Sequence, residues 1–162
     1  MRRLLIANRG EIARRIQRTA RAMGVATVAV FTEIDRHMPF VHEADVAVVI
    51  GSYLDSNQLI AAAQRAAADA IHPGYGFLSE RADFAQACRD AGLVFVGPSP
   101  DAIMLMASKL SARAIAQHAE LPVSRATQDV ERANEIGFPL LAKASAGGGG
   151  RGMRLVERAA DL

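Results

Sequence analysis

The sequence has no tryptophan, a single cysteine and no long apolar run. One cysteine, Cys88, excludes an internal disulfide and is typical of a reducing compartment such as the cytoplasm. We find no run long enough to cross a membrane and no signal-peptide core, so we expect no membrane partner. Aromatic residues make up only 5% of the chain and the formal net charge is +2. A nucleic-acid partner would need more of both, so we expect none.

The charge is unevenly distributed. The first 21 residues hold seven arginines and one acid, which gives this segment a charge of +6. Targeting peptides are also rich in arginine and poor in acids, but the segment equally has the pattern of a strand, a turn and a helix. Ile12, Ile16, Ala20 and Met23 form an apolar stripe at helical spacing, and Gly24 is expected to end this helix.

Short β-rich runs alternate with Ala-rich helical stretches. The expected strands are residues 4–7, 25–31, 45–50, 70–71 and 93–96. Asn57 and Ser79 are candidate N-caps of two intervening helices, and Phe84 and Cys88 are expected to face the core. This alternation predicts an α/β fold, with a Rossmann-like parallel sheet of about five strands and right-handed crossovers.

A proline- and glycine-rich segment, residues 97–100, ends the last of these strands. We therefore expect one domain over residues 1–110 and the beginning of another over 111–162. Two helical patterns, at 101–106 and 108–118, lead up to and across this boundary. Beyond it the sequence predicts a helix at about 130–136 and strands at 139–144 and 153–156. These elements are too few to close a core, so the sequence resembles a fragment of a longer protein.

Four consecutive glycines, residues 147–150, separate the last two strands. Glycine leaves backbone N–H groups unshielded and able to converge on an anion, and Lys143 would direct an ammonium group to the same place. The pattern is neither a P-loop nor a dinucleotide fingerprint. A glycine-rich hairpin that binds nucleotide phosphates is the favoured interpretation, and a flexible surface turn is the alternative.

Two further loops follow predicted strands, where open α/β sheets bind ligands. In the first, Asn8 and Gly10 are more readily explained by shaping a turn than by contacting a ligand. In the second, His72 is either a proton carrier or a packed core histidine, with the core role favoured. Lys109 is either a solvated lysine or a second cation for a nucleotide. No Cys/His or paired-carboxylate spacing indicates a metal site.

Taken in order, these segments resemble the biotin carboxylase family. The resemblance is carried by residues 5–13 (LIANRGEIA), 70–80 (AIHPGYGFLSE), 95–98 (FVGP) and 143–153 (KASAGGGGRGM). It implies a biotin carboxylase N-terminal (pre-ATP-grasp) domain over residues 1–110, then a linker and a partial ATP-grasp lid over 111–162. Such enzymes are ligases that use MgATP and bicarbonate to carboxylate biotin on a carrier domain, for transfer to an acyl-CoA or pyruvate.

The resemblance also implies roles for individual residues. Lys143 would contact the ATP phosphates, Met153 would pack near the adenine, and Lys109 would be the ATP-binding lysine of the linker. Gly149 and Gly150 would supply backbone donors.

In the first domain, the resemblance implies that Tyr75 and Gly76 border the biotin pocket. It further implies that Arg15 and Arg18 lie at the dimer interface of a homo-oligomer. The implied partners are a biotin carboxyl carrier domain and a carboxyltransferase component, in the cytoplasm or, in a eukaryote, the mitochondrial matrix.

Some positions depart from the family pattern. Ala146 replaces a glycine, Ala107 and Ser108 replace a Gly-Asp pair, and the segments after Gly51 and at 122–128 are short, through deletions or omitted loops. The family's catalytic residues and Mg (or Mn) ligands lie beyond residue 162, so we expect this chain alone to be inactive. Another ATP-grasp ligase of the carbamoyl-phosphate synthetase type, or a non-catalytic nucleotide-binding module, are the alternatives.

Overall fold

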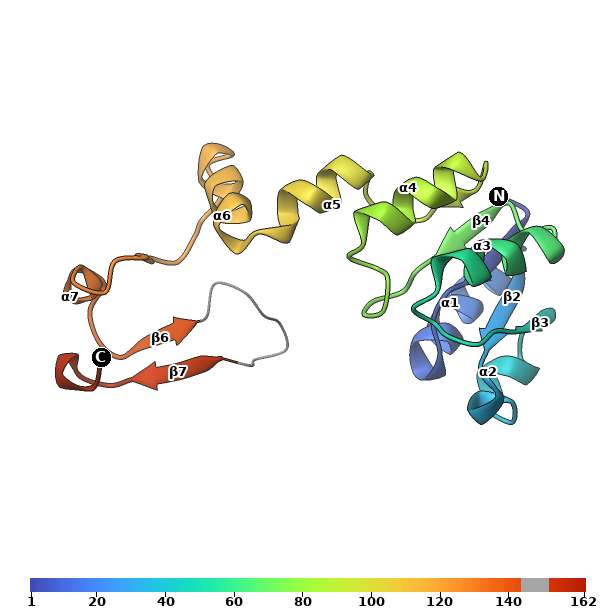
Figure 1. Ribbon diagram of the computed structural model, residues 1–162, viewed down its shortest axis with the longest axis horizontal. Coiled ribbons are helices and arrows are strands. Elements are labelled where there is room, and N and C mark those ends of the chain that lie inside the picture. The colour runs from blue at the N-terminus through green and yellow to red at the C-terminus, as the bar shows by residue number, and fades with distance from the viewer. Residues whose placement is uncertain (144–151) are drawn as a thin grey trace. The chain divides into compact units, whose positions relative to one another are not determined.

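The computed structural model describes residues 1–143 and 152–162, without the side chains of Lys109 and Leu110. The chain divides into two compact units, Met1–Ala107 and Ser108–Leu162. Figure 1 labels most of the helices and strands of the two units.

The first unit is built on a five-stranded sheet. Its strands are β1 (Arg3–Ile6), β2 (Ala26–Phe31), β3 (Val46–Val49), β4 (Ala70–His72) and β5 (Val94–Phe95). They lie in the order β3-β2-β1-β4-β5, and every neighbouring pair is parallel. This confirms the predicted α/β fold, and each predicted strand is present within one or two residues of its expected ends.

Helices cover both faces of this sheet (Figure 1). They are α1 (Gly10–Ala22), α2 (Pro39–His42), α3 (Ser56–Arg65) and α4 (Ala82–Asp90), with a 3-10 turn, η1 (Glu33–Asp35). Helix α5 (Pro100–Ala107) follows β5 and packs against α4. Side chains of β1 alternate between the faces: Leu4 and Ile6 pack in the core with α1 and α2, whereas Leu5 packs with α3 and α4. Two apolar cores therefore fix the sheet from both sides.

The buried face of α1 differs from the expected stripe. Ala13, Gln17 and Ala20 are buried, whereas Ile16 is only half-buried and Met23 is 65% exposed. Gln17 is buried because its Nε2 donates a hydrogen bond to the Phe40 carbonyl at 2.7 Å. Its Oε1 has no partner among the described residues.

Two expected helix caps are also different. Asp55, rather than Asn57, caps α3, and its carboxylate accepts the backbone N–H of Gln58 at 3.1 Å. Helix α4 begins at Ala82 after Arg81, so Ser79 belongs to the preceding loop and does not cap it. The inward positions of Phe84 and Cys88 are confirmed, because both are buried on α4.

The second unit contains an antiparallel hairpin. Its elements are α6 (Lys109–His118), α7 (Ala133–Ile136), β6 (Leu140–Lys143), β7 (Met153–Val156) and the 3-10 turn η2 (Ala159–Asp161). Ser108 caps α6 by accepting the Ser111 N–H. The predicted helix at 130–136 is present only as α7, and the predicted end of β6 at Ala144 lies outside the described residues.

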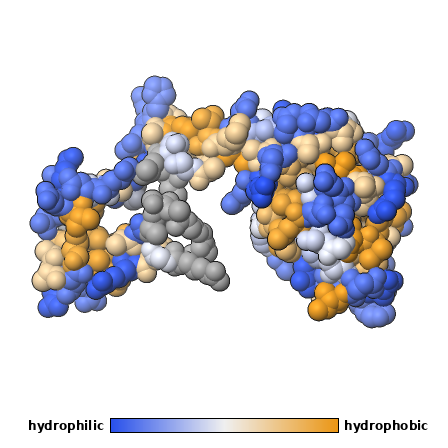
Figure 2. Space-filling model, viewed as in Figure 1, coloured by the Kyte–Doolittle hydropathy of each residue, from blue (hydrophilic) through white to orange (hydrophobic). Residues whose placement is uncertain are grey.

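Apolar side chains remain exposed on α5 and on the hairpin, where Figure 2 shows hydrophobic surface. Met104, Leu105 and Met106 of α5 are 57–59% exposed, and Leu155 of β7 is 59% exposed. Within the described parts of the chain, no helix combines the length and the apolar character needed to cross a membrane.

Candidate functional site

The carboxyl ends of the parallel strands bring four loops of the first unit to one edge of the sheet. These loops follow β1, β2, β3 and β4 and cover residues 7–9, 32–35, 50–55 and 73–79. In open α/β sheets this edge is where ligands bind. Because β1 and β4 are parallel neighbours, the Asn8 loop lies beside the Tyr75 loop.

Asn8 holds the loop that follows β4. Its side chain is fully buried, and its Nδ2 donates to the carbonyls of Pro73 at 2.8 Å and Tyr75 at 2.9 Å. Its Oδ1 accepts the backbone N–H of Arg9 at 2.9 Å. The buried amide thus connects the loop after β1 to the loop after β4, which supports the structural role that the sequence favoured for Asn8.

His72 and Gly74 fit closely around this amide. Gly74 has a φ of +68°, and an added Cβ would lie 2.6 Å from Asn8 Nδ2. The N–H of Gly74 donates to Nδ1 of His72 at 3.0 Å. Burial lowers the pKa of His72, which favours the neutral ring with its proton on Nε2. These contacts support the structural role of His72 over that of a proton carrier.

The tip of this loop is open to solvent. Tyr75 is 57% exposed, and its hydroxyl donates a hydrogen bond to a carboxylate oxygen of Glu11. That bond raises the pKa of Tyr75. No atom lies within 4 Å of the position that a Cβ would take on Gly76. An accessible aromatic ring therefore stands beside an unshielded stretch of backbone.

A buried carboxylate, Asp35, lies at the same edge and was not singled out from the sequence. It is 1% exposed and accepts hydrogen bonds from Arg9 at 2.5 Å, Tyr53 at 2.8 Å and Thr32 at 3.1 Å. Burial, followed by the hydrogen bond to Asp35, raises the pKa of Tyr53. The available signal in the sequence was position: Arg9 follows β1, Asp35 follows β2, and the two strands are neighbours in the sheet.

In the second unit, the hairpin register places Lys143 directly opposite Met153. Opposite residues of an antiparallel pair share a face of the sheet, so these two candidate ATP-binding residues lie on one side of the hairpin. Both are exposed. Gly149 and Gly150 lie outside the described residues, and Lys109 is described only as the first residue of α6.

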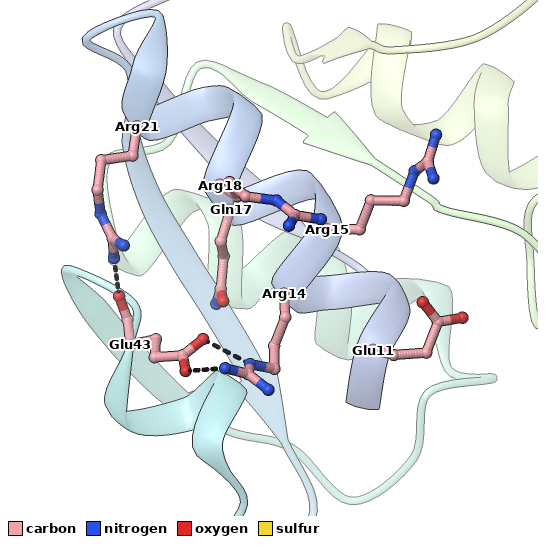
Figure 3. Close-up of a pocket in the computed structure, with 7 residues that line it drawn as sticks. All are labelled: Glu11, Arg14, Arg15, Gln17, Arg18, Arg21 and Glu43. Atoms are coloured by element: carbon pink, nitrogen blue, oxygen red, sulfur yellow. Dashed lines mark hydrogen bonds and ion pairs between the residues drawn. The ribbon is translucent and has the colours of Figure 1, made fainter.

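Helix α1 carries the basic face predicted from the sequence. A shallow groove of about 450 Å³ is lined by Glu11, Arg14, Arg15, Gln17, Arg18, Arg21 and Glu43. Figure 3 shows Arg14 and Arg21 directed toward Glu43, whereas Arg15 points to the other side. Arg14 forms two hydrogen bonds with the Glu43 carboxylate, at 2.6 and 2.8 Å. Arg15 and Arg18 form no ion pair with any residue that the structure describes.

Residues that could bind a metal or attack a substrate are not clustered in the described ranges. No group of three or more His, Cys, Asp or Glu side chains there could hold a metal ion. Burial in the core raises the pKa of the Cys88 thiol to about 12, which keeps it protonated and unreactive at neutral pH. What the described part offers is binding surface: a backbone loop, an aromatic ring and cations.

We compared the sequence with models of known protein families, and two of them match. Residues 1–103 match the family model described as "Biotin carboxylase, N-terminal domain", and residues 102–162 match "Carbamoyl-phosphate synthase L chain, ATP binding domain". The first match covers well over half of the 162 residues, and the chain therefore belongs to the biotin carboxylase family.

Two curated proteins illustrate the similarity in sequence. The chain is 49% identical to a biotin carboxylase from Nostoc over 169 residues, which cover 96% of this chain and 38% of the relative. It is 48% identical to the alpha subunit of mitochondrial methylcrotonoyl-CoA carboxylase from Oryza sativa subsp. japonica over 174 residues, covering 99% and 24%. The chain thus spans about two-fifths or less of the length of these relatives.

Solved structures show the same fold. The biotin carboxylase from Campylobacter jejuni, in a complex with β-γ-ATP, aligns with a TM-score of 0.90 at 43% identity and covers 99% of this chain and 39% of that one. The biotin carboxylase domain of 2-oxoglutarate carboxylase from Hydrogenobacter thermophilus, solved with MgADP, ADP and bicarbonate, aligns with a TM-score of 0.87 at 40% identity, covering 99% and 38%.

Proposed function

We propose that this chain is the amino-terminal part of a biotin carboxylase. The complete enzyme would use MgATP and bicarbonate to carboxylate carrier-bound biotin, which then transfers the carboxyl group to an acyl-CoA or pyruvate. The observation that carries this proposal is the pair of adjoining family matches, a biotin carboxylase N-terminal domain followed by an ATP-binding domain, along nearly the whole chain. In these terms the first unit is the pre-ATP-grasp domain, and the second is the linker with part of the lid.

For ATP, we propose that Lys143 contacts the phosphates and Met153 packs near the adenine. Their shared face on the hairpin supports this assignment, because one bound nucleotide could then touch both. Gly149, Gly150 and Lys109 complete the proposed site on the strength of the sequence resemblance. The sequence resemblance implies that the Mg ligands are supplied by later parts of the enzyme.

For biotin, we propose that Tyr75 and Gly76 form one border of the pocket. The exposure of the Tyr75 ring and the open space at Gly76 support it. The proposed partners are a biotin carboxyl carrier domain and a carboxyltransferase component, because the matched relatives include carboxylase subunits and a pyruvate carboxylase. The proposed location is the cytoplasm, or the mitochondrial matrix in a eukaryote.

The ATP assignment is tested by Lys143→Ala in the complete enzyme. A charge-assisted contact to phosphate contributes about 1.5–3 kcal/mol, so the Kd for MgATP should rise roughly tenfold to a hundredfold. The Kd is measured by calorimetric titration. Arg154→Ala is the matched control: Arg154 is an exposed cation one residue from Met153 and pairs with Ala142, so it lies on the opposite face of the hairpin. Equal effects of both variants would contradict the proposed role of Lys143.

A ligase of the carbamoyl-phosphate synthetase type is the second candidate. The match of residues 102–162 to the ATP-binding domain of carbamoyl-phosphate synthase is the observation in its favour. The two candidates differ in the acceptor of the activated bicarbonate. Phosphate release by the complete enzyme with MgATP and bicarbonate should increase on adding free biotin, whereas stimulation by ammonia instead would support the second candidate.

A further inference from the structure

Two buried residues, Asp35 and Tyr53, connect the loop of the proposed biotin pocket to the core of the first unit. We propose that Asp35 and Tyr53 are positioning residues, which hold the loop of residues 73–79 in the conformation that binds biotin. The inference rests on the proposed function, because it assigns a purpose to the loop that carries Tyr75 and Gly76.

The first step is the fixed position of Asp35. Both of its carboxylate oxygens are in use: Oδ1 accepts from Arg9, and Oδ2 accepts from Tyr53 and Thr32. The side chain is 2% exposed. A buried carboxylate is tolerated only when its lone pairs are satisfied, so Asp35 and its three donors hold one another in place. These donors come from the loops after β1, β2 and β3.

The second step is the contact from Tyr53 to the loop. The Tyr53 hydroxyl donates to Asp35, while its ring stacks on that of Phe77, with centroids 5.1 Å apart and planes 14° apart. Tyr53 is 6% exposed, and the Arg9 guanidinium lies 6.0 Å from its ring centroid. Tyr53 therefore connects the buried carboxylate to Phe77, which is the residue after Gly76.

The third step is the conformation of Phe77 itself. Its φ is +47°, in the left-handed region that side chains other than glycine seldom adopt. Such a conformation persists where surrounding contacts enforce it. The Tyr53 ring supplies a contact at Phe77, and the Asn8 amide fixes the carbonyls of Pro73 and Tyr75 on the other side of Gly76.

These contacts have a consequence for binding. When a ligand binds only one conformation of a loop, its apparent Kd is the intrinsic Kd divided by the fraction of molecules in that conformation. The smaller this fraction, the weaker the apparent binding. Weakening the Asp35–Tyr53 contact should therefore lower the apparent affinity for biotin. It should leave the chemistry at saturating biotin and the binding of MgATP unchanged, because in this proposal the two buried residues act only through the loop.

The experiment uses the complete enzyme with Tyr53→Phe and Asp35→Asn. Tyr53→Phe keeps the ring on Phe77 and removes only the hydroxyl, so it remains informative if Asp35→Asn fails to fold. We expect KM for free biotin to rise about tenfold, as for the loss of one hydrogen bond to a charged group. We expect kcat and the Kd for MgATP to stay within about twofold, and hydrogen exchange of the Tyr75–Leu78 amides to accelerate.

Asp69→Asn is the control. Asp69 accepts the backbone N–H groups of Arg2 and Arg3 at the opposite end of β4, so this change perturbs the same sheet away from the loop. It should leave KM for biotin unaltered.

Two results would overturn the inference, and they are distinguishable. Unchanged exchange at Tyr75–Leu78 in both variants would show that Asp35 and Tyr53 do not position the loop. Faster exchange with an unchanged KM for biotin would show that the loop moves but does not serve biotin, which also removes Tyr75 and Gly76 from the proposed pocket. Failure of the proposed function itself is seen separately, as a wild-type enzyme that biotin does not stimulate.

Discussion

At the level of single residues, Gly74 is the position where the loop after β4 tolerates least change. Gly74→Ala introduces a Cβ 2.6 Å from Asn8 Nδ2 and 2.8 Å from Ile12 Cγ2. Asn8 cannot yield without losing its bonds to Pro73 and Tyr75. We expect a loss of about 1–2 kcal/mol from the left-handed φ and about 1–3 kcal/mol more from the clash. This loss of stability is measured as a decrease in the thermal midpoint for unfolding of the first unit.

Gly76→Ala is the matched comparison for this prediction. Gly76 has a similar φ of +71°, but no atom lies within 4 Å of its Cβ position. Only the backbone term of about 1–2 kcal/mol should remain. If both variants lowered the midpoint equally, the close fit of Gly74 against Asn8 would not be a real constraint.

The sequence predicted apolar residues at this scale better than buried polar ones. Phe84 and Cys88 were recognised because they are four residues apart on a helix and apolar. Gln17 and Asp35 were missed because nothing local marks them for burial. Their partners, the Phe40 carbonyl and the Tyr53 hydroxyl, are distant in the sequence, so only the folded chain shows the hydrogen bonds that accompany their burial.

At the level of elements, carboxylates tie the amino ends of the strands together. Asp45 precedes β3 and accepts both the backbone N–H and the hydroxyl of Thr27 in β2, at 2.7 and 2.9 Å. Asp69 precedes β4 and accepts the N–H groups of Arg2 and of Arg3, the first residue of β1. These bonds lower the pKa of both aspartates.

This lowering predicts how the contribution of Asp45 depends on pH. The folded protein binds a proton at Asp45 less readily than the unfolded chain, so the ionised group stabilises the fold above the unfolded pKa of about 3.9. The stabilisation is lost as pH falls through the folded pKa. The difference in thermal midpoint between the wild type and Asp45→Asn should therefore be constant near neutral pH and shrink below about pH 4.

Thr27→Val refines this test, because it removes the hydroxyl donor to Asp45 and keeps the backbone donor. It should reduce the pH-dependent difference without abolishing it. A difference between wild type and Asp45→Asn that stays constant down to about pH 3 would contradict the assigned role of the carboxylate.

The sequence was informative about elements where apolar runs and helical spacing agreed, and less so at their ends. All five strands of the first unit were expected. The caps were not, because Asp55 and Asn57 are both good capping residues only two positions apart, and the sequence does not show at which of them the backbone turns into the helix. Helix α4 begins after Arg81, whose side chain makes no capping hydrogen bond, so no sequence signal marks that end.

At the level of the whole molecule, the two units differ in how completely they bury their apolar residues. The first encloses two cores between a sheet and its helices. The second leaves Leu141, Met153 and Leu155 of its hairpin 46–59% exposed. A two-stranded sheet is marginally stable by itself, which fits a chain that spans about two-fifths or less of the length of its relatives.

The basic face of α1 gives a prediction about the assembly of the complete enzyme. Arg14 is neutralised by Glu43 within the chain, whereas Arg15 and Arg18 form no ion pair within the described part. We propose that they meet acidic groups on a second subunit. Reversing both to Glu would replace attraction by repulsion across the interface, so the dissociation constant of the dimer should rise about tenfold or more.

Analytical ultracentrifugation over a range of protein concentrations measures this constant. The matched control is a double reversal at Arg65 and Arg89, two exposed arginines in the last turns of α3 and α4, which changes the net charge equally at other places. Added salt should weaken the wild-type dimer more than the Arg15→Glu/Arg18→Glu variant, because screening removes an attraction that only the wild type has. If both double variants dimerise like the wild type, Arg15 and Arg18 form a solvated helix face, and the uneven charge of the first 21 residues needs another explanation.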